Sequence, residues 1–151
     1  MKEIIIGVMC ILGIAALLKY ANVTNLRGNP EKLVGHYYML GPLTFAYQFK
    51  GDALEAERAK LVGDNEKRKL IASRAIHAHT RIDISEKTDA ERKSDPWGTH
   101  KFPAKVIDID TTHPGITLVQ IEPQKGVGKN SHWWLNMNRL SVDQEWHPSS
   151  N

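Results

Sequence analysis

The sequence predicts an α+β fold, in which a single N-terminal transmembrane helix precedes a small, mainly antiparallel β domain with one or two short helices. Three observations support this prediction: an uncharged apolar N-terminus, strong helix formers in the middle of the chain, and alternating apolar and polar residues between turns in the last third. The 151 residues suffice for one domain, either barrel-like or an open sheet. The predicted parts are a transmembrane anchor (1–23), a juxtamembrane linker (24–32), the α+β domain (33–147) and a C-terminal tail (148–151).

The N-terminal segment is the basis for a predicted membrane location. Residues 4–18 carry no charge, and fifteen helical residues span about 22 Å, less than the roughly 30 Å of a bilayer core. Tyr20 and Val23 extend this run, and the long side chain of Lys19 can reach the headgroups. A cleaved signal peptide is the alternative, but small residues are poorly placed for cleavage. We therefore expect a single-pass anchor, with the side of the domain left open.

Two strands are expected after the linker. Residues 36–40 and 43–49 flank a Gly-Pro turn, which predicts a hairpin. Every second residue of the later strand is large and apolar, so this face is expected to be buried. The residues of this face are Leu43, Phe45, Tyr47 and Phe49.

Helices are predicted in the middle of the chain. Asp52 and Glu55 have the spacing of a capping box, strong helix formers fill Ala53–Val62, and Gly63 ends the pattern. A second, shorter helix is expected over Glu66–Arg74.

The remaining elements are mostly strands. Alternation over Ala75–Ile84 predicts a strand with one solvent-exposed face, and Thr88 is expected to cap one turn of helix. Strands over Phe102–Asp110 and Ile116–Glu122 are joined by a turn, and Ser131–Val142 returns after a Gly/Lys loop.

The charge balance gives little indication of a polyanionic partner. Lysine and arginine exceed aspartate and glutamate by 20 − 17 = 3. The only local excess, Lys67–Lys69, stands beside Asp64 and Glu66, so we interpret it as a solvated helix face. Without an extended basic stripe, nucleic acid is disfavoured as a partner.

Histidines raise the question of a metal site. His77 and His79 would lie on the same face of the strand predicted over Ala75–Ile84, where two imidazoles can share an ion. Several residues could complete the ligand set, but no motif fixes a third ligand, so exposed histidines are the preferred interpretation. These candidates are Asp83, His100, Asp108, Asp110, His113 and His132. No metal and no other cofactor is predicted.

Catalytic motifs are incomplete. Residues 122–130 resemble a phosphate loop only superficially, since Pro123 replaces the first glycine and Asn130 the magnesium-binding Ser/Thr. Asp108, Asp110 and Glu122 with Lys125 fit a metal-dependent nuclease poorly. The chain has no Gly-x-Ser-x-Gly motif, and Cys10 is its only cysteine and lies in the apolar segment. No catalytic residue is predicted.

Aromatic and basic residues near the end of the chain are the predicted interaction site. Trp133 and Trp134 are adjacent on a strand and point to opposite faces, so one is expected in the core and one outside. The outward ring would bind a partner together with Lys125 and Lys129.

The sequence thus favours a non-catalytic, single-pass membrane-anchored accessory or assembly subunit that docks on other proteins of a membrane complex. The bilayer would be contacted through residues 1–23. Two alternatives stay open. One is a membrane-tethered metal-binding protein or hydrolase that uses His77 and His79, and the other is a tethered polymer-binding module that uses the tryptophan and lysine residues above.

Overall fold

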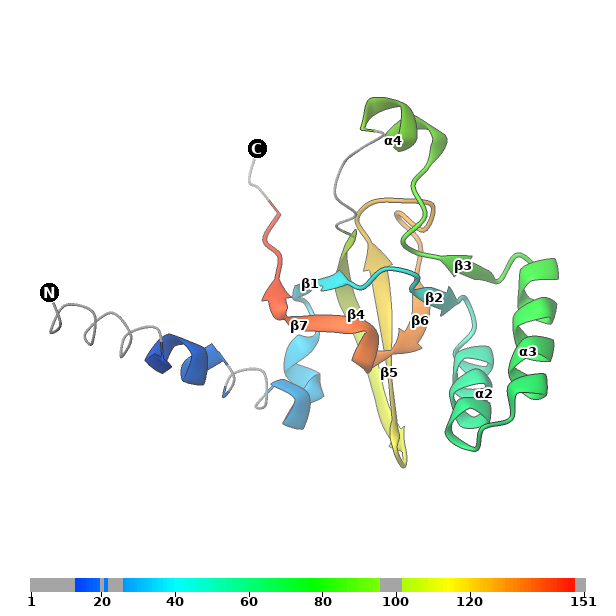
Figure 1. Cartoon of the computed structure of the whole chain (residues 1–151), viewed down its shortest axis with the longest axis horizontal. Helices are drawn as coiled ribbons and strands as arrows, with labels where there is room; N and C mark the ends of the chain where they lie inside the picture. The colour runs from blue at the N-terminus through cyan, green and yellow to red at the C-terminus, as the bar shows by residue number, and fades with distance from the viewer. Residues whose placement is uncertain (1–12, 20, 22–25, 96–101, 149–151) are drawn as a thin grey trace, which may run out of the picture.

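An antiparallel sheet is the centre of the structure (Figure 1). The computed structural model describes residues 13–19, 21, 26–95 and 102–148. The seven strands of this described part have the order β3-β2-β6-β5-β4-β1-β7, and each neighbouring pair is antiparallel. Helices accompany the sheet, which confirms the α+β class of the domain. The strands are β1 (Tyr37–Leu40), β2 (Phe45–Tyr47), β3 (Arg81–Asp83), β4 (Phe102–His113), β5 (Ile116–Pro123), β6 (Trp133–Asn136) and β7 (Leu140–Glu145). The helices are α2 (Lys50–Leu61), α3 (Asn65–His77) and α4 (Asp89–Ser94), with two 3-10 helices, η1 (Pro30–Leu33) and η2 (Met137–Arg139).

The predicted transmembrane helix requires correction. Of residues 1–23, the structure describes 13–19, which are helical, and 21; the others lie outside the described residues. Nowhere in the described ranges is a helix both long enough and apolar enough to cross a membrane. This finding contradicts the predicted anchor and the single-pass membrane location inferred from it.

The predicted hairpin is also wrong, although both of its strands exist. β1 pairs with β4 and β7, whereas β2 pairs with β3 and β6, so the two strands lie far apart in the sheet. The Gly-Pro segment between them is therefore a crossover, and long-range pairing has overridden the local turn pattern.

Strand β2 also presents the face opposite to the one predicted. Thr44 and Ala46 are buried, whereas Phe45 is 43% exposed. Leu43 takes a left-handed φ of +52° where the chain enters the strand, and its backbone N–H is held by the Ser85 hydroxyl. Ala46 of β2 thus enters the main core, whereas Tyr47 packs against the cluster that contains Ala53 of α2.

The predicted helix over Ala53–Val62 is confirmed as α2, although its capping residues differ. Phe49 is the N-cap and makes no side-chain cap bond, while Asp52 and Glu55 bind Arg74 of α3 instead. The strand predicted over Ala75–Ile84 is wrong over most of its length, because α3 continues to His77 and only Arg81–Asp83 is a strand.

The physical reason for the longer helix is its contact with α2. Ile71 and Ala75, one helical turn apart, are both buried, and this spacing continues the helix through the segment that alternates in the sequence.

Beyond β3, Thr88 caps α4 as predicted, and it forms a capping box with Glu91. Glu91 also accepts a hydrogen bond from the backbone N–H of Gly126 at 2.9 Å, which ties α4 to the loop between β5 and β6.

Apolar side chains pack on both faces of the sheet. The main core takes residues from β7 and β2 alike, so the sheet curves around it. A smaller helix-side cluster joins α2 to the opposite face through Ala53, Ile116, Leu118 and Trp134. The main core consists of Leu33, Tyr38, Leu40, Ala46, Ile84, Phe102, Ala104, Val106, Val119, Ile121, Trp133, Leu135, Leu140 and Val142.

The two adjacent tryptophans of β6 give a direct test of this two-sided packing. Trp133 and Trp134 are each 8% exposed, one in the main core and one in the helix-side cluster. Trp133→Ala and Trp134→Ala should therefore each lower the free energy of unfolding by about 3–5 kcal/mol, as aromatic-to-alanine core substitutions do. Urea unfolding of both variants checks this, with the exposed Phe49→Ala as control. A variant of either tryptophan that unfolds like wild type would contradict the two-sided core.

Candidate anion-binding site

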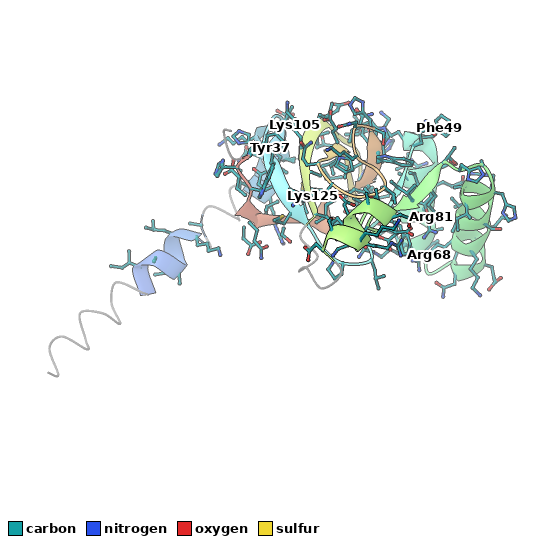
Figure 2. The ribbon with its side chains drawn as sticks, turned by 90° about the horizontal axis from the view of Figure 1, so that it is seen from above. Tyr37, Phe49, Arg68, Arg81, Lys105 and Lys125 are labelled. Atoms are coloured by element: carbon teal, nitrogen blue, oxygen red, sulfur yellow. The ribbon has the colours of Figure 1, made fainter. Side chains whose placement is uncertain are left out.

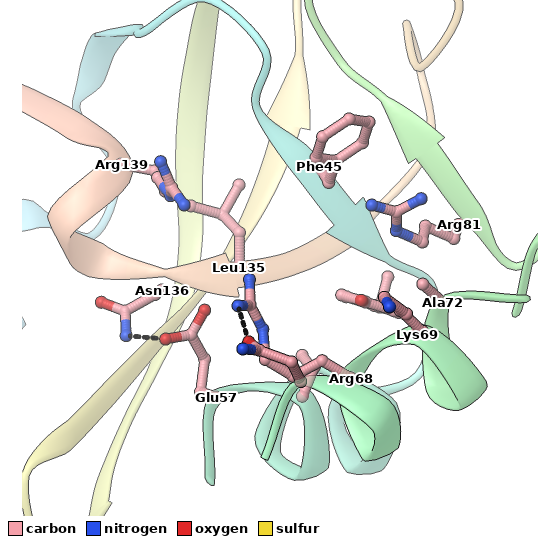
Figure 3. Close-up of a pocket in the computed structure, with 13 residues that line it drawn as sticks. Phe45, Glu57, Arg68, Lys69, Ala72, Arg81, Leu135, Asn136 and Arg139 are labelled. Atoms are coloured by element: carbon pink, nitrogen blue, oxygen red, sulfur yellow. Dashed lines mark hydrogen bonds between the residues drawn. The ribbon is translucent and has the colours of Figure 1, made fainter. Parts of the chain in front are cut away.

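A cavity of about 410 Å³ lies between the sheet and the two long helices. Small, apolar and basic side chains line it (Figure 3). Its volume falls in the range of small-ligand pockets. The lining residues are Phe45, Tyr47, Ala53, Ala56, Glu57, Asn65, Arg68, Lys69, Ala72, Arg81, Leu135, Asn136 and Arg139.

Helix α3 supplies one wall, and its basic residues divide between two roles. Arg74 binds Asp52 at 2.6 Å and Glu55 at 3.3 Å, and Lys67 binds Glu55 at 3.4 Å. These bonds lower the pKa of Glu55, with the Arg74 hydrogen bond as the largest cause. This face of α3 is therefore neutralised by α2.

The other face of α3 is not neutralised in the same way. Asn65, Arg68, Lys69 and Ala72 have helical spacing and line the cavity together. Lys69 pairs with Glu66 at 3.0 Å, but Arg68 reaches only the neutral side chain of Asn65, at 3.3 Å. In the described part of the chain, Arg68 has no carboxylate partner.

Strand β3 contributes a second arginine. Arg81 pairs with Tyr47 of β2, and its guanidinium carbon lies 4.0 Å from the centroid of the Phe45 ring and 5.8 Å from that of Tyr47. Its Nε is buried and has no hydrogen-bond acceptor among the described residues. The nearby Asp83 carboxylate instead accepts two hydrogen bonds from Ser85. The aromatic rings thus fix the Arg81 guanidinium, while no carboxylate in the described ranges pairs with it.

The third arginine lies at the end of β6. Arg139 belongs to η2 and is exposed, and no ion pair of its side chain is found within the described ranges. The acidic residue of the cavity is Glu57, whose Oε2 accepts a hydrogen bond from Asn136 Nδ2 at 2.9 Å. Figure 3 shows Arg68, Arg81 and Arg139 on different sides of the same hollow. Three guanidinium groups therefore face one carboxylate.

An ion pair between Lys50 and Asp110 holds the start of α2 against the sheet. Because residues of α2 line the cavity, this pair also helps to position the cavity. Lys50 at the start of α2 lies 3.0 Å from Asp110 of β4, and the Asp110 side chain is only 7% exposed. The hydroxyl and backbone N–H of Thr112 donate to Asp110 at 2.6 and 2.9 Å. These two bonds, followed by Lys50, hold the pKa of the Asp110 carboxyl well below its usual range.

Replacing Asp110 tests this ion pair through its pH dependence. A carboxyl whose folded-state pKa is lowered stabilises the fold above its unfolded pKa, about 3.9, and loses this contribution as the pH falls further. Asp110→Asn should lower the free energy of unfolding by about 1–3 kcal/mol at pH 7. The difference from wild type should be unchanged at pH 5 and smaller at pH 3. Urea unfolding at the three pH values measures it, and a difference at pH 3 equal to that at pH 7 would show that the ionised carboxylate is not responsible.

The predicted interaction residues do not form one exposed surface. Both tryptophans are buried, so the expectation of one outward ring is corrected; β6 is covered by the curved sheet on one face and by α2 on the other. Lys125 and Lys129 are exposed on the loop between β5 and β6. Figure 2 shows Lys125 away from Arg68 and Arg81, which lie near α3.

The histidine pair is not brought together on a strand. His77 ends α3, where its Nδ1 lies 2.8 Å from the Ser73 carbonyl oxygen, and His79 follows in a turn with a φ of +56°. Neither shares a strand face with the other, which corrects the predicted arrangement. His100 lies outside the described residues. Within the described ranges, no three His, Cys, Asp or Glu side chains are grouped so that they could hold a metal ion.

The three arginines of the cavity do not stand out in the sequence. The alternating pattern predicts that Arg81 lies on the solvent-exposed face of a strand over Ala75–Ile84, although much of that segment is helical in the structure. The charge pattern assigns Arg68 to a solvated helix face, although Arg68 lines the cavity. The available signal is the basic run Lys67–Lys69, in which Arg68 and Lys69 line the cavity, while Lys67 and Lys69 pair with glutamates.

Comparisons of the chain with protein-family models, with curated proteins and with solved structures find no match. The geometry and charge of the cavity therefore carry the functional proposal.

Proposed function

We propose that this protein is a non-catalytic docking protein that binds an acidic segment of a partner protein in the cavity between β2, β3, α2 and α3. The observation that carries the proposal is the set of three arginines, Arg68, Arg81 and Arg139, which line one cavity and lack carboxylate partners in the described structure. Arginine is enriched among the residues that dominate binding energy at protein interfaces.

The composition of the cavity favours a peptide over a bare anion. The small apolar side chains of Ala56 and Ala72 line the cavity together with the charged groups, and Phe45 is 43% exposed. A peptide segment can cover such apolar surface with its own side chains while its carboxylates pair with the arginines.

The distribution of charge favours a protein over a nucleic acid. The basic residues next to the cavity are neutralised, since Lys67 and Arg74 bind glutamate and aspartate of α2. The net charge of the whole chain is only +3. The unpaired arginines of the cavity therefore adjoin neutralised basic residues, whereas nucleic-acid backbones require positive charge that extends along a surface.

Selection from a random peptide library tests the proposal and requires no identified partner. A displayed library of dodecapeptides should yield binders enriched in aspartate and glutamate, whose affinity falls as salt rises. The double variant Arg68→Gln/Arg139→Gln should weaken the selected peptides by at least tenfold, because each arginine supplies charged hydrogen bonds at the site.

A matched control removes the same charge elsewhere. Lys125→Gln/Lys129→Gln also removes two positive charges, but from the exposed loop between β5 and β6, and should change affinity less than twofold. If this control weakens binding as much as the arginine variant does, the loop predicted from the sequence is the interaction site. A library that yields no acidic binder would overturn the docking function.

A further inference from the structure

We propose that the group recognised in the cavity is a phosphomonoester, carried by a phosphorylated tyrosine side chain of the partner. This inference rests on the docking function proposed above and specifies the chemistry of the segment that docks. It follows from the charge count, the hydrogen-bonding state of the arginines and the apolar lining of the same cavity.

The charge count calls for a doubly charged ligand. Lys69 also lines the cavity but is paired with Glu66, so the unpaired basic residues are Arg68, Arg81 and Arg139, which together with Glu57 give a local balance of 3 − 1 = +2. A phosphomonoester carries about −1.5 to −2 charge at pH 7, whereas one carboxylate carries −1. The phosphomonoester matches the cavity more closely.

The arginines also provide suitable donors. A guanidinium presents its N–H groups as a planar fork that fits phosphate oxygens, and three such groups lie around one hollow (Figure 3). Arg81 is held by its stacking on Phe45, and the described structure contains no acceptor for its buried Nε. A ligand in the cavity would therefore bind Arg81 through its terminal N–H groups, which have no carboxylate partner among the described residues.

The apolar lining explains why the phosphate would be carried by an aromatic side chain. The apolar side chains of the cavity that keep solvent-accessible surface are Ala56, Ala72 and the Phe45 and Tyr47 rings. A phenyl ring covers this surface, whereas the short stem of a phosphoserine leaves it exposed to water.

Fluorescence polarisation with matched peptides tests the inference. The probes are one labelled nonapeptide of glycine and serine with a central phosphotyrosine, and its tyrosine, glutamate and phosphoserine versions; inorganic phosphate serves as competitor. The phosphotyrosine peptide should bind at least tenfold more tightly than each of the others. Its affinity should fall below pH 6, where the phosphate gains a proton while arginine stays charged.

Two variants link the result to the site. Arg81→Lys keeps the charge but loses the planar fork, so it should reduce the preference for phosphotyrosine over glutamate at least fivefold. Arg68→Gln, on an exposed helix face, should weaken the phosphopeptide at least fivefold without altering thermal unfolding. Lys93→Gln on α4 is the control and should leave binding unchanged.

The outcomes separate this inference from the docking function. If acidic peptides bind but phosphotyrosine offers no advantage over glutamate, docking stands and the phosphate inference is overturned. A phosphoserine peptide that binds equally well overturns the aromatic carrier. If inorganic phosphate binds and no peptide does, the cavity is a small-anion site. This result would overturn both the docking function and the inference that a phosphotyrosine side chain carries the phosphate.

Discussion

Burial of β6 on both faces is the constraint on which the rest of the structure depends. Trp133 and Leu135 pack into the main core, while Trp134 packs against Ala53 of α2. A strand buried in this way must lie inside the sheet and beneath a helix, which fixes the position of α2. Lys50 and Asp110 then hold the start of that helix against β4. Tyr47 packs against the helix-side cluster, whereas Phe45 of the same strand is 43% exposed, and both rings line the cavity.

The charges of the two helices determine which basic residues are available. Asp52 and Glu55 of α2 form ion pairs with Arg74 and Lys67 of α3 and so neutralise them. Arg68 of α3 is not paired in this way and lines the cavity. Exposed ion pairs of this kind add little to stability. Their larger effect is on the distribution of charge, because they remove Arg74 and Lys67 from the basic residues available beside the cavity. We propose that the arginines left unpaired form a docking site for a compact anionic group.

Local patterns predict the elements whose neighbours in sequence are also their neighbours in space. The α2 helix, the capping box at Thr88 and the β4–β5 hairpin are of this kind. The pairing of β1 with β2 is wrongly predicted because both strands bond to distant partners. The alternation over Ala75–Ile84 is overridden by packing of Ile71 and Ala75 against α2. The cavity escapes prediction because Arg68, Arg81 and Arg139 come from three separate elements and meet only in the folded chain.

We infer that the three cavity arginines are available to bind an anion, whereas Arg74 is not. Nitrogen-15 NMR of the arginine Nε–H groups, followed during a titration with phenyl phosphate, measures this availability residue by residue. Saturable shifts are expected at Arg68, Arg81 and Arg139, and none at Arg74, which is held by Asp52 at 2.6 Å. Equal shifts at all four, or no saturable shift at the three cavity arginines, would contradict it.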